Sequence, residues 1–138
     1  MIVLDTDLIS ELMKPAPDLR VAHWLQQQDA LDIYLTTVSL AELRYGVDRL
    51  PPSYRRDMLS IQVDRLFGRN AEGRVLAFDE LAAYEFGEIA AQVDGRVSEM
   101  VFDIQIAAIA RARGAAVATR NTKHFKLFEV PLINPWDA

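Results

Sequence analysis

The first ten residues, Met1–Ser10 (MIVLDTDLIS), contain the strongest fold signal in the chain. Residues 2–4 are an uninterrupted apolar run that leads directly into Asp5. Such a run, bounded by polar residues, is typical of a strand buried on both faces of a parallel sheet. Ligands of parallel sheets bind outside the carboxyl ends of the strands, so Asp5 and then Asp7 lie where a functional site is expected. A carboxylate buried there needs a cationic partner, hydrogen bonds or a metal ion.

Length and composition limit the class of protein. The chain has 138 residues, of which 51% are hydrophobic and 25% charged, as expected of a single folded domain spanning 1–138. It has no cysteine, which excludes disulfides and thiolate metal sites, and its net charge of −5 does not favour binding nucleic acid through charge alone. No apolar run approaches the ~18 residues of a membrane span, and no signal peptide is visible. We therefore expect a cytoplasmic protein with no membrane partner.

Apolar periodicity predicts strands that alternate with helices. Asp18 and Asp79 are expected to cap helices, and Thr6 or Asp7 to cap the first one. The predicted strands span residues 2–4, 33–35, 75–78, 116–119 and 132–133. The predicted helices span about 6–13, 19–25, 38–46, 53–67, 80–93 and 101–113. This order indicates an α/β fold, with a short central parallel sheet of about four or five strands flanked by helices.

Three acids stand near strand ends or inside apolar helices: Asp5, Glu42 and Asp103. Singly, each has an ordinary structural explanation, as a helix cap, a solvated helix residue or an aspartate at a helix N-terminus. Together, an all-oxygen cluster without His or Cys suits Mg²⁺ or Mn²⁺ rather than zinc. Such ions activate water and clamp phosphoryl oxygens. Spacing alone leaves both interpretations open.

Four segments in order resemble the successive motifs of PIN-domain ribonucleases: residues 4–10 (LDTDLIS), 39–46 (SLAELRYG), 103–110 (DIQIAAIA) and 118–125 (ATRNTKHF). The chain looks most like the VapC and FitB type toxins of bacterial toxin–antitoxin pairs. The resemblance extends to residues 134–136 (NPW), so it covers essentially the whole chain. Each motif alone is weak, whereas four in order at these separations are specific.

The resemblance implies a small PIN-like α/β domain whose acids bind one or two Mg²⁺, with Mn²⁺ a possible substitute, and cleave single-stranded or looped RNA. Asp5, Glu42 and Asp103 match the family's catalytic, metal-binding acids. Thr119 matches the hydroxyl residue that supports the first aspartate, and Asp7 is expected to support the site as well. Asn121 stands where many members carry a fourth aspartate, so a second metal would be weakly held until RNA phosphate supplies oxygens.

The implied reaction is hydrolysis of an RNA phosphodiester. A metal held by Asp5 and Asp103 would lower the pKa of a bound water that attacks phosphorus, while Glu42 would coordinate or orient that water. The products would carry a 5′-phosphate and a 3′-hydroxyl. The resemblance also implies a homodimer that a small cognate antitoxin neutralises.

Basic residues after the strand at 116–119 could hold RNA phosphates, and a solvated basic turn is an equally good explanation of them. They are Arg120, Lys123, His124 and Lys126. His124 has no partner visible in the sequence, and we do not assign it as a catalytic base. Trp24 and Tyr45 could stack on bases, but their helical spacing favours core or interface packing.

Two rival functions fit parts of the sequence. Asp5-Thr6-Asp7 resembles the D-x-D opening of haloacid-dehalogenase-type phosphatases, in which the first aspartate is a nucleophile, but no acidic pair follows the strand at 116–119. A PIN scaffold that only binds RNA or a partner protein would explain Asn121 as the mark of a degraded site. The presence of all three acids speaks against that alternative.

Overall fold

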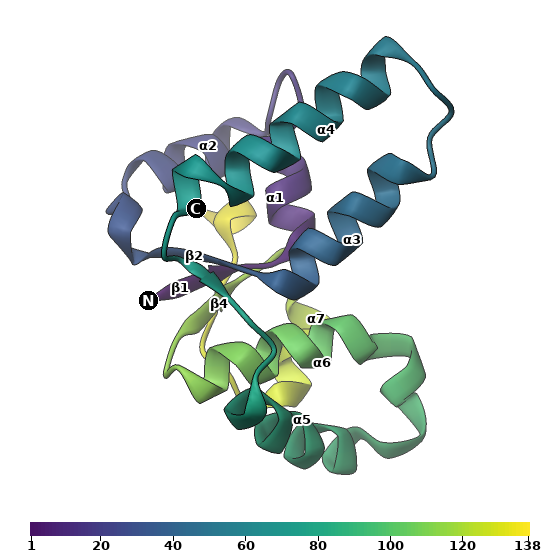
Figure 1. The fold of residues 1–138 in the computed structure, drawn as a ribbon. Coiled ribbons are helices and arrows are strands. Elements are labelled where there is room, and N and C mark those ends of the chain that lie inside the picture. The colour runs from purple at the N-terminus through teal and green to yellow at the C-terminus, as the bar shows by residue number, and fades with distance from the viewer.

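A parallel sheet of five strands runs through the centre of the protein, in the order β3-β2-β1-β4-β5 (Figure 1). It is seen in a computed structural model that describes residues 1–138. All neighbouring strands pair in parallel. The strands are β1 (Ile2–Leu4), β2 (Ile33–Thr36), β3 (Val75–Leu76), β4 (Ala116–Ala118) and β5 (Leu132–Ile133). This confirms the predicted α/β fold.

The central strand is β1, and the strand order reverses there. From β1 the chain proceeds to β2 and β3 on one side, and later builds β4 and β5 on the other side. A reversal of this kind opens a crevice at the carboxyl ends of the adjacent strands. Asp5 follows β1 and Thr119 follows β4, so both residues lie beside that crevice.

Helices cover both faces of the sheet (Figure 1). One face carries α1 (Thr6–Leu12), α2 (Leu19–Gln26), α3 (Thr37–Asp48) and α4 (Tyr54–Phe67), and the other carries α5 (Glu80–Val93), α6 (Val97–Ala112) and α7 (Thr122–Phe125). Short 3₁₀ turns lie at Ala30–Asp32, Arg69–Ala71, Asp94–Arg96, Lys126–Phe128 and Pro135–Asp137. None of the helices combines the length and the apolar character needed to cross a membrane.

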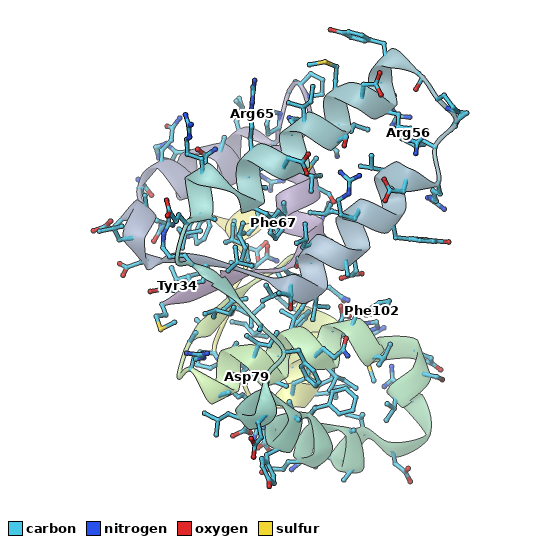
Figure 2. The ribbon with its side chains drawn as sticks, viewed as in Figure 1. Tyr34, Arg56, Arg65, Phe67, Asp79 and Phe102 are labelled. Atoms are coloured by element: carbon cyan, nitrogen blue, oxygen red, sulfur yellow. The ribbon has the colours of Figure 1, made fainter.

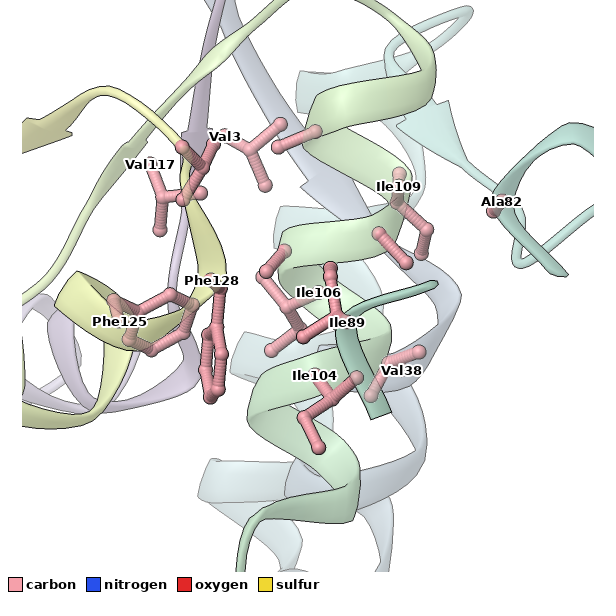
Figure 3. Close-up of a cluster of buried hydrophobic side chains, with 14 of the residues drawn as sticks. Val3, Val38, Ala82, Ile89, Ile104, Ile106, Ile109, Val117, Phe125 and Phe128 are labelled. Atoms are coloured by element: carbon pink, nitrogen blue, oxygen red, sulfur yellow. The ribbon is translucent and has the colours of Figure 1, made fainter. Parts of the chain in front are cut away.

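Each face of the sheet has its own hydrophobic core, and β1 contributes to both. Val3 belongs to the cluster that contains Ile104 and Phe125, which Figure 3 shows between the sheet and α6. The next residue, Leu4, belongs to the cluster of Leu8 and Trp24 on the opposite face. Successive side chains of a strand point to opposite faces, so this division confirms that β1 is buried on both sides. It also holds Asp5 at a fixed position.

The helix caps agree with the sequence prediction at Asp18 and Asp79, whose carboxylates accept hydrogen bonds from the N–H groups of Arg20 and Ala82. The predicted cap of α1 was wrong, because Asp5 itself takes that place. Its backbone is extended, and its side chain accepts a hydrogen bond from the Thr6 N–H at 2.7 Å. The strand therefore passes into the helix without a connecting turn.

Element boundaries also differ from prediction, most clearly at β3 and α6. β3 ends at Leu76 instead of Phe78, since the Phe78 ring turns to pack edge-on against Phe86 of α5, with 5.8 Å between the ring centroids. α6 begins at Val97, before the predicted start, and has non-helical backbone angles at Met100. The kink precedes Asp103 by less than one turn, so Asp103 stands early in the regular part of the helix.

Candidate active site

Asp5 is the most buried acid at the crevice, with a relative exposure of 4%. One carboxylate oxygen accepts the Thr6 N–H, and the other accepts the Thr119 hydroxyl at 2.7 Å. Burial is the main cause that raises the pKa of Asp5 to about 8, and the negative charges of Asp7 and Asp103 raise it further. The hydrogen bonds from Thr119 and Thr6 lower the pKa but do not cancel the effect of burial. The pKa of Asp5 therefore lies well above its ordinary value.

Asp7 lies one turn into α1, in the same acidic environment. Burial raises its pKa, although hydrogen bonding with Asp5 and nearby N–H groups opposes the shift. Its Oδ1 atom is buried and has no hydrogen-bond partner. An unpartnered buried carboxylate oxygen is costly, so this atom is available to a cation or a water molecule.

Glu42 reaches the crevice from α3, and two hydroxyl groups hold it there. The Thr6 Oγ1–H donates to Glu42 Oε1 at 2.7 Å. Thr6 Oγ1 also lies 2.8 Å from Ser39 Oγ, and because the single hydroxyl hydrogen of Thr6 is already used, Ser39 is the donor in that pair. Burial raises the pKa of Glu42, the Thr6 hydrogen bond opposes the rise, and the charges of Asp103 and Asp7 add to it.

Asp103 approaches from the opposite face of the sheet, on α6, and its side chain is 24% exposed. Its Oδ2 atom accepts a hydrogen bond from Asn121 Nδ2 at 3.2 Å and lies 3.1 Å from His124 Nδ1. Asn121 Nδ2 is also 2.9 Å from His124 Nδ1. Asn121 therefore acts as a neutral donor to an acid of the site, in the place where a fourth aspartate was expected. The exposed Phe102, adjacent in sequence, lies on the side of α6 that faces α3 (Figure 2).

Two contacts with these acids were not predicted from the sequence: that of Thr6, whose hydroxyl is in turn bonded to Ser39, and that of His124, which was named only as a possible RNA contact. Thr6 lies between Asp5 and Asp7, and Ser39 precedes Glu42 by one helical turn, so their spacing was a usable signal. His124 gave no such signal, because its partner Asp103 is 21 residues away in sequence. Only the packing of α7 against α6 brings them together.

The predicted basic residues do not neutralise the carboxylates. Arg120, Lys123 and Lys126 are exposed, and none forms an ion pair, whereas His124 pairs with Asp103. Of the two aromatic residues, Trp24 is buried in the core as predicted. Tyr45 does not pack in the core; it is 69% exposed, and the Arg49 guanidinium lies 5.8 Å from its ring centroid.

The donor set suits a hard cation, although the side chains do not enclose one. No three Asp, Glu, His or Cys side chains stand close enough to hold a metal ion between them. Four carboxyl groups nevertheless share the crevice, with a free oxygen on Asp7 and a raised pKa at Asp5. Carboxylate oxygens are the ligands that Mg²⁺ and Mn²⁺ prefer, and these ions keep several water ligands. The residues present therefore fit such an ion.

The fold and its acidic crevice are those of a PIN domain. Residues 2–129 match the family model described as PIN domain, so the chain belongs to the PIN-domain family. It is similar over its length to the VapC ribonuclease Y4jK of Sinorhizobium fredii, with 39% identity over 139 residues that cover 99% of each chain. It is also similar to Toxin FitB of Neisseria gonorrhoeae, with 36% identity over 137 residues and 99% coverage of each.

A solved structure agrees with these relatives. The structure of FitAcB from Neisseria gonorrhoeae superposes with a TM-score of 0.85 and 34% identity, covering 100% of both chains. The chain is thus a PIN-domain protein with full-length similarity to VapC and FitB toxins. That similarity confirms the predicted family.

Proposed function

We propose that this protein is a Mg²⁺-dependent endoribonuclease, able to use Mn²⁺ in place of Mg²⁺, and the toxin of a type II toxin–antitoxin pair. One observation carries the proposal. Four carboxyl groups, those of Asp5, Asp7, Glu42 and Asp103, come from elements that meet at the carboxyl end of the central strand, and the charge of Asp103 adds to the effect of burial in raising the pKa of the other three. Repulsion among these groups lowers the stability of the fold, and a bound cation would relieve it.

Asp5 and Asp103 would hold the ion, and Glu42 and the free oxygen of Asp7 would contact it through its water ligands. A bound Mg²⁺ supplies activation of water and charge stabilisation at phosphoryl oxygens. RNA phosphate would complete the coordination where Asn121 offers no charge. The products would carry a 5′-phosphate and a 3′-hydroxyl.

The other residues of the site orient its acids. Thr119 and the Thr6 N–H fix both oxygens of Asp5, so the plane of that carboxyl group is set before any ligand binds. The Thr6 hydroxyl, which accepts a hydrogen bond from Ser39, donates to one oxygen of Glu42 and leaves the other free. The oxygen of Glu42 that accepts no hydrogen bond would orient a water molecule beside the phosphorus.

Cleavage of RNA by the purified protein tests this proposal. Wild-type protein should cut single-stranded RNA with Mg²⁺ or Mn²⁺ and stop when EDTA is added. Asp103→Asn should lower the rate by at least about 100-fold, because a charged ligand of the ion is lost. Asp57→Asn, at an exposed position on α4, is the matched control and should cleave normally. Undiminished cleavage in excess EDTA would refute the metal-dependent mechanism.

We further propose a homodimer in the cytoplasm that binds a small cognate antitoxin. FitB, the FitAB complex and FitAcB support a two-protein system. A groove of about 800 Å³ between α1, α3 and α4 begins at Thr6 and Glu42 and continues past the exposed Tyr54 and Met58. An antitoxin segment in that groove would reach the acids. Co-purification with the product of the neighbouring small gene, lost when Met58→Glu is introduced, is the expected result.

A further inference from the structure

Arg120 follows the carboxyl end of β4, at the edge of the sheet where the acidic crevice lies. It lies between Thr119, which donates to Asp5, and Asn121, which donates to Asp103. Its side chain is exposed and forms no ion pair with any of the acids. Instead, its guanidinium lies over the Trp136 ring, 5.3 Å from the centroid. A guanidinium that pairs with no carboxylate is available to an anion.

The Trp136 ring is held firmly. Its relative exposure is 5%, and it packs in the cluster that contains Leu4 and Trp24. The backbone N–H of Trp136 donates to Asn134 Oδ1 at 3.0 Å, which closes the turn after β5. β5 pairs with β4, and the Thr119 N–H donates to the carbonyl oxygen of Ile133 at 2.9 Å. The ring is therefore fixed relative to Thr119, and through Thr119 to Asp5.

Lys123, Lys126 and Arg49 differ from Arg120 in this respect. The two lysines have no ring or carboxylate to hold them. Arg49 lies over Tyr45, but that ring is itself 69% exposed and so is not anchored. Arg120 alone combines a buried aromatic support with a position beside the acids.

We propose that Arg120, held on Trp136, binds a phosphate of the RNA backbone next to the one that is cleaved. This inference rests on the proposed ribonuclease function. A guanidinium presents a planar fork that matches two phosphate oxygens, and stacking on an indole leaves its N–H edge free for them. In a protein with a net charge of −5, a fixed cation at this edge also offsets the repulsion between the acids and the RNA.

Binding and cleavage can be measured separately. Binding is followed by the fluorescence anisotropy of a fluorescein-labelled single-stranded RNA, in the Asp103→Asn background with Mg²⁺, across a range of NaCl concentrations. Arg120→Ala should raise Kd roughly tenfold, since a hydrogen-bonded charge is lost. The slope of log K against log[salt] should become less negative by about 0.7, the value for one phosphate contact on a single strand. Arg120→Lys keeps the charge, so it should keep the slope while raising Kd.

The control is Arg65→Ala on α4, an exposed arginine that points away from the sheet in Figure 2 and forms no ion pair. It removes the same charge and should leave Kd and the slope unchanged. In the protein with Asp103 intact, Arg120→Ala should raise KM and leave kcat within about twofold, because Arg120 touches no reacting atom.

Variants of Trp136 test whether its ring positions Arg120. Trp136→Leu should raise Kd, and adding Arg120→Ala to it should cause little further loss, because the two residues act as one unit. Trp136→Phe keeps a ring in the core, so it should fold and show a smaller loss. If Trp136 only supports the core, both variants lower the melting temperature, and Arg120→Ala keeps its full effect in each.

Two further outcomes distinguish this inference from the proposed ribonuclease function on which it rests. If the wild type cleaves RNA with Mg²⁺ but Arg120→Ala matches Arg65→Ala in Kd and slope, the inference is wrong and the ribonuclease proposal stands. If the wild type neither binds nor cleaves RNA, both are wrong.

Discussion

Replacing Asp5 with asparagine should stabilise the metal-free protein at neutral and alkaline pH. The pKa of Asp5 is raised from 3.8 to about 8, mainly by burial. At 1.36 kcal/mol per pH unit, this difference corresponds to roughly 6 kcal/mol at most. Side-chain rotation and proton sharing with Asp7 will reduce that value. Even half of it is a large fraction of the ~5–15 kcal/mol stability of a typical domain.

The direction of the pH dependence follows from the proton balance. Between pH 3.8 and about 8 the folded protein keeps the Asp5 proton and the unfolded chain has lost it. The folded state therefore binds more protons, and its stability falls as pH rises through this window. Above about pH 8 the loss is complete. Asp5→Asn has no such proton to lose, and asparagine remains a good N-cap for α1, so its curve should be flatter.

Melting curves from pH 4 to 9 measure this effect, with EDTA or with Mg²⁺. For the wild type near pH 8, Mg²⁺ at 100 times its Kd should add about 2.7 kcal/mol, or roughly 10 °C in Tm. Asp5→Asn should lose most of that response. Asp57→Asn, at an exposed position, is the control and should behave as the wild type. If wild type and Asp5→Asn show the same pH dependence and the same response to Mg²⁺, Asp5 does not belong to a cation site.

Three further predictions concern the rest of the site and the partner. Thr6→Val removes the donor to Glu42 and should lower the cleavage rate by about tenfold, whereas Thr6→Ser should restore it; equal rates in both variants would contradict the role of the hydroxyl. Asn121→Asp places a second carboxylate beside Asp103, so calorimetry should show tighter Mg²⁺ binding and a lower melting temperature without metal; weaker binding would mean that the amide serves another purpose. Expression of the intact protein should arrest growth, and co-expression of the neighbouring small gene should relieve the arrest; normal growth of cells in which RNA is cleaved would argue against a toxin.

The sequence was most informative where a local rule sets the structure. The apolar run before Asp5 predicted a buried central strand, and Asp18 and Asp79 predicted helix starts, because strand burial and N-capping depend on neighbouring residues. The same rules were less reliable at element ends. β3 stops two residues early because Phe78 packs on α5, and that contact joins two elements whose approach local spacing does not specify.

The candidate acids were identified from motif order, but their surroundings were not. Asp5, Glu42 and Asp103 come from three elements, and their mutual distances depend on how α3 and α6 cross opposite faces of the sheet. Thr6 supports Glu42 directly and Ser39 supports it through Thr6, and neither role was assigned from the sequence. The pair of His124 with Asp103 could not be predicted at all, since no local pattern relates residues 21 positions apart on separate helices.

The sequence by itself determined that this chain forms a parallel α/β domain of the PIN type with acids after its central strand. It could do so because the periodicity of apolar residues, the helix-capping residues and the motifs each lie within short segments of the sequence. Only the tertiary structure showed which hydroxyl groups hold the acids, that burial raises the pKa of Asp5, and that the Arg120 guanidinium lies over the Trp136 ring. Those properties depend on burial and on distances between separate elements, which chain folding sets and local sequence does not contain.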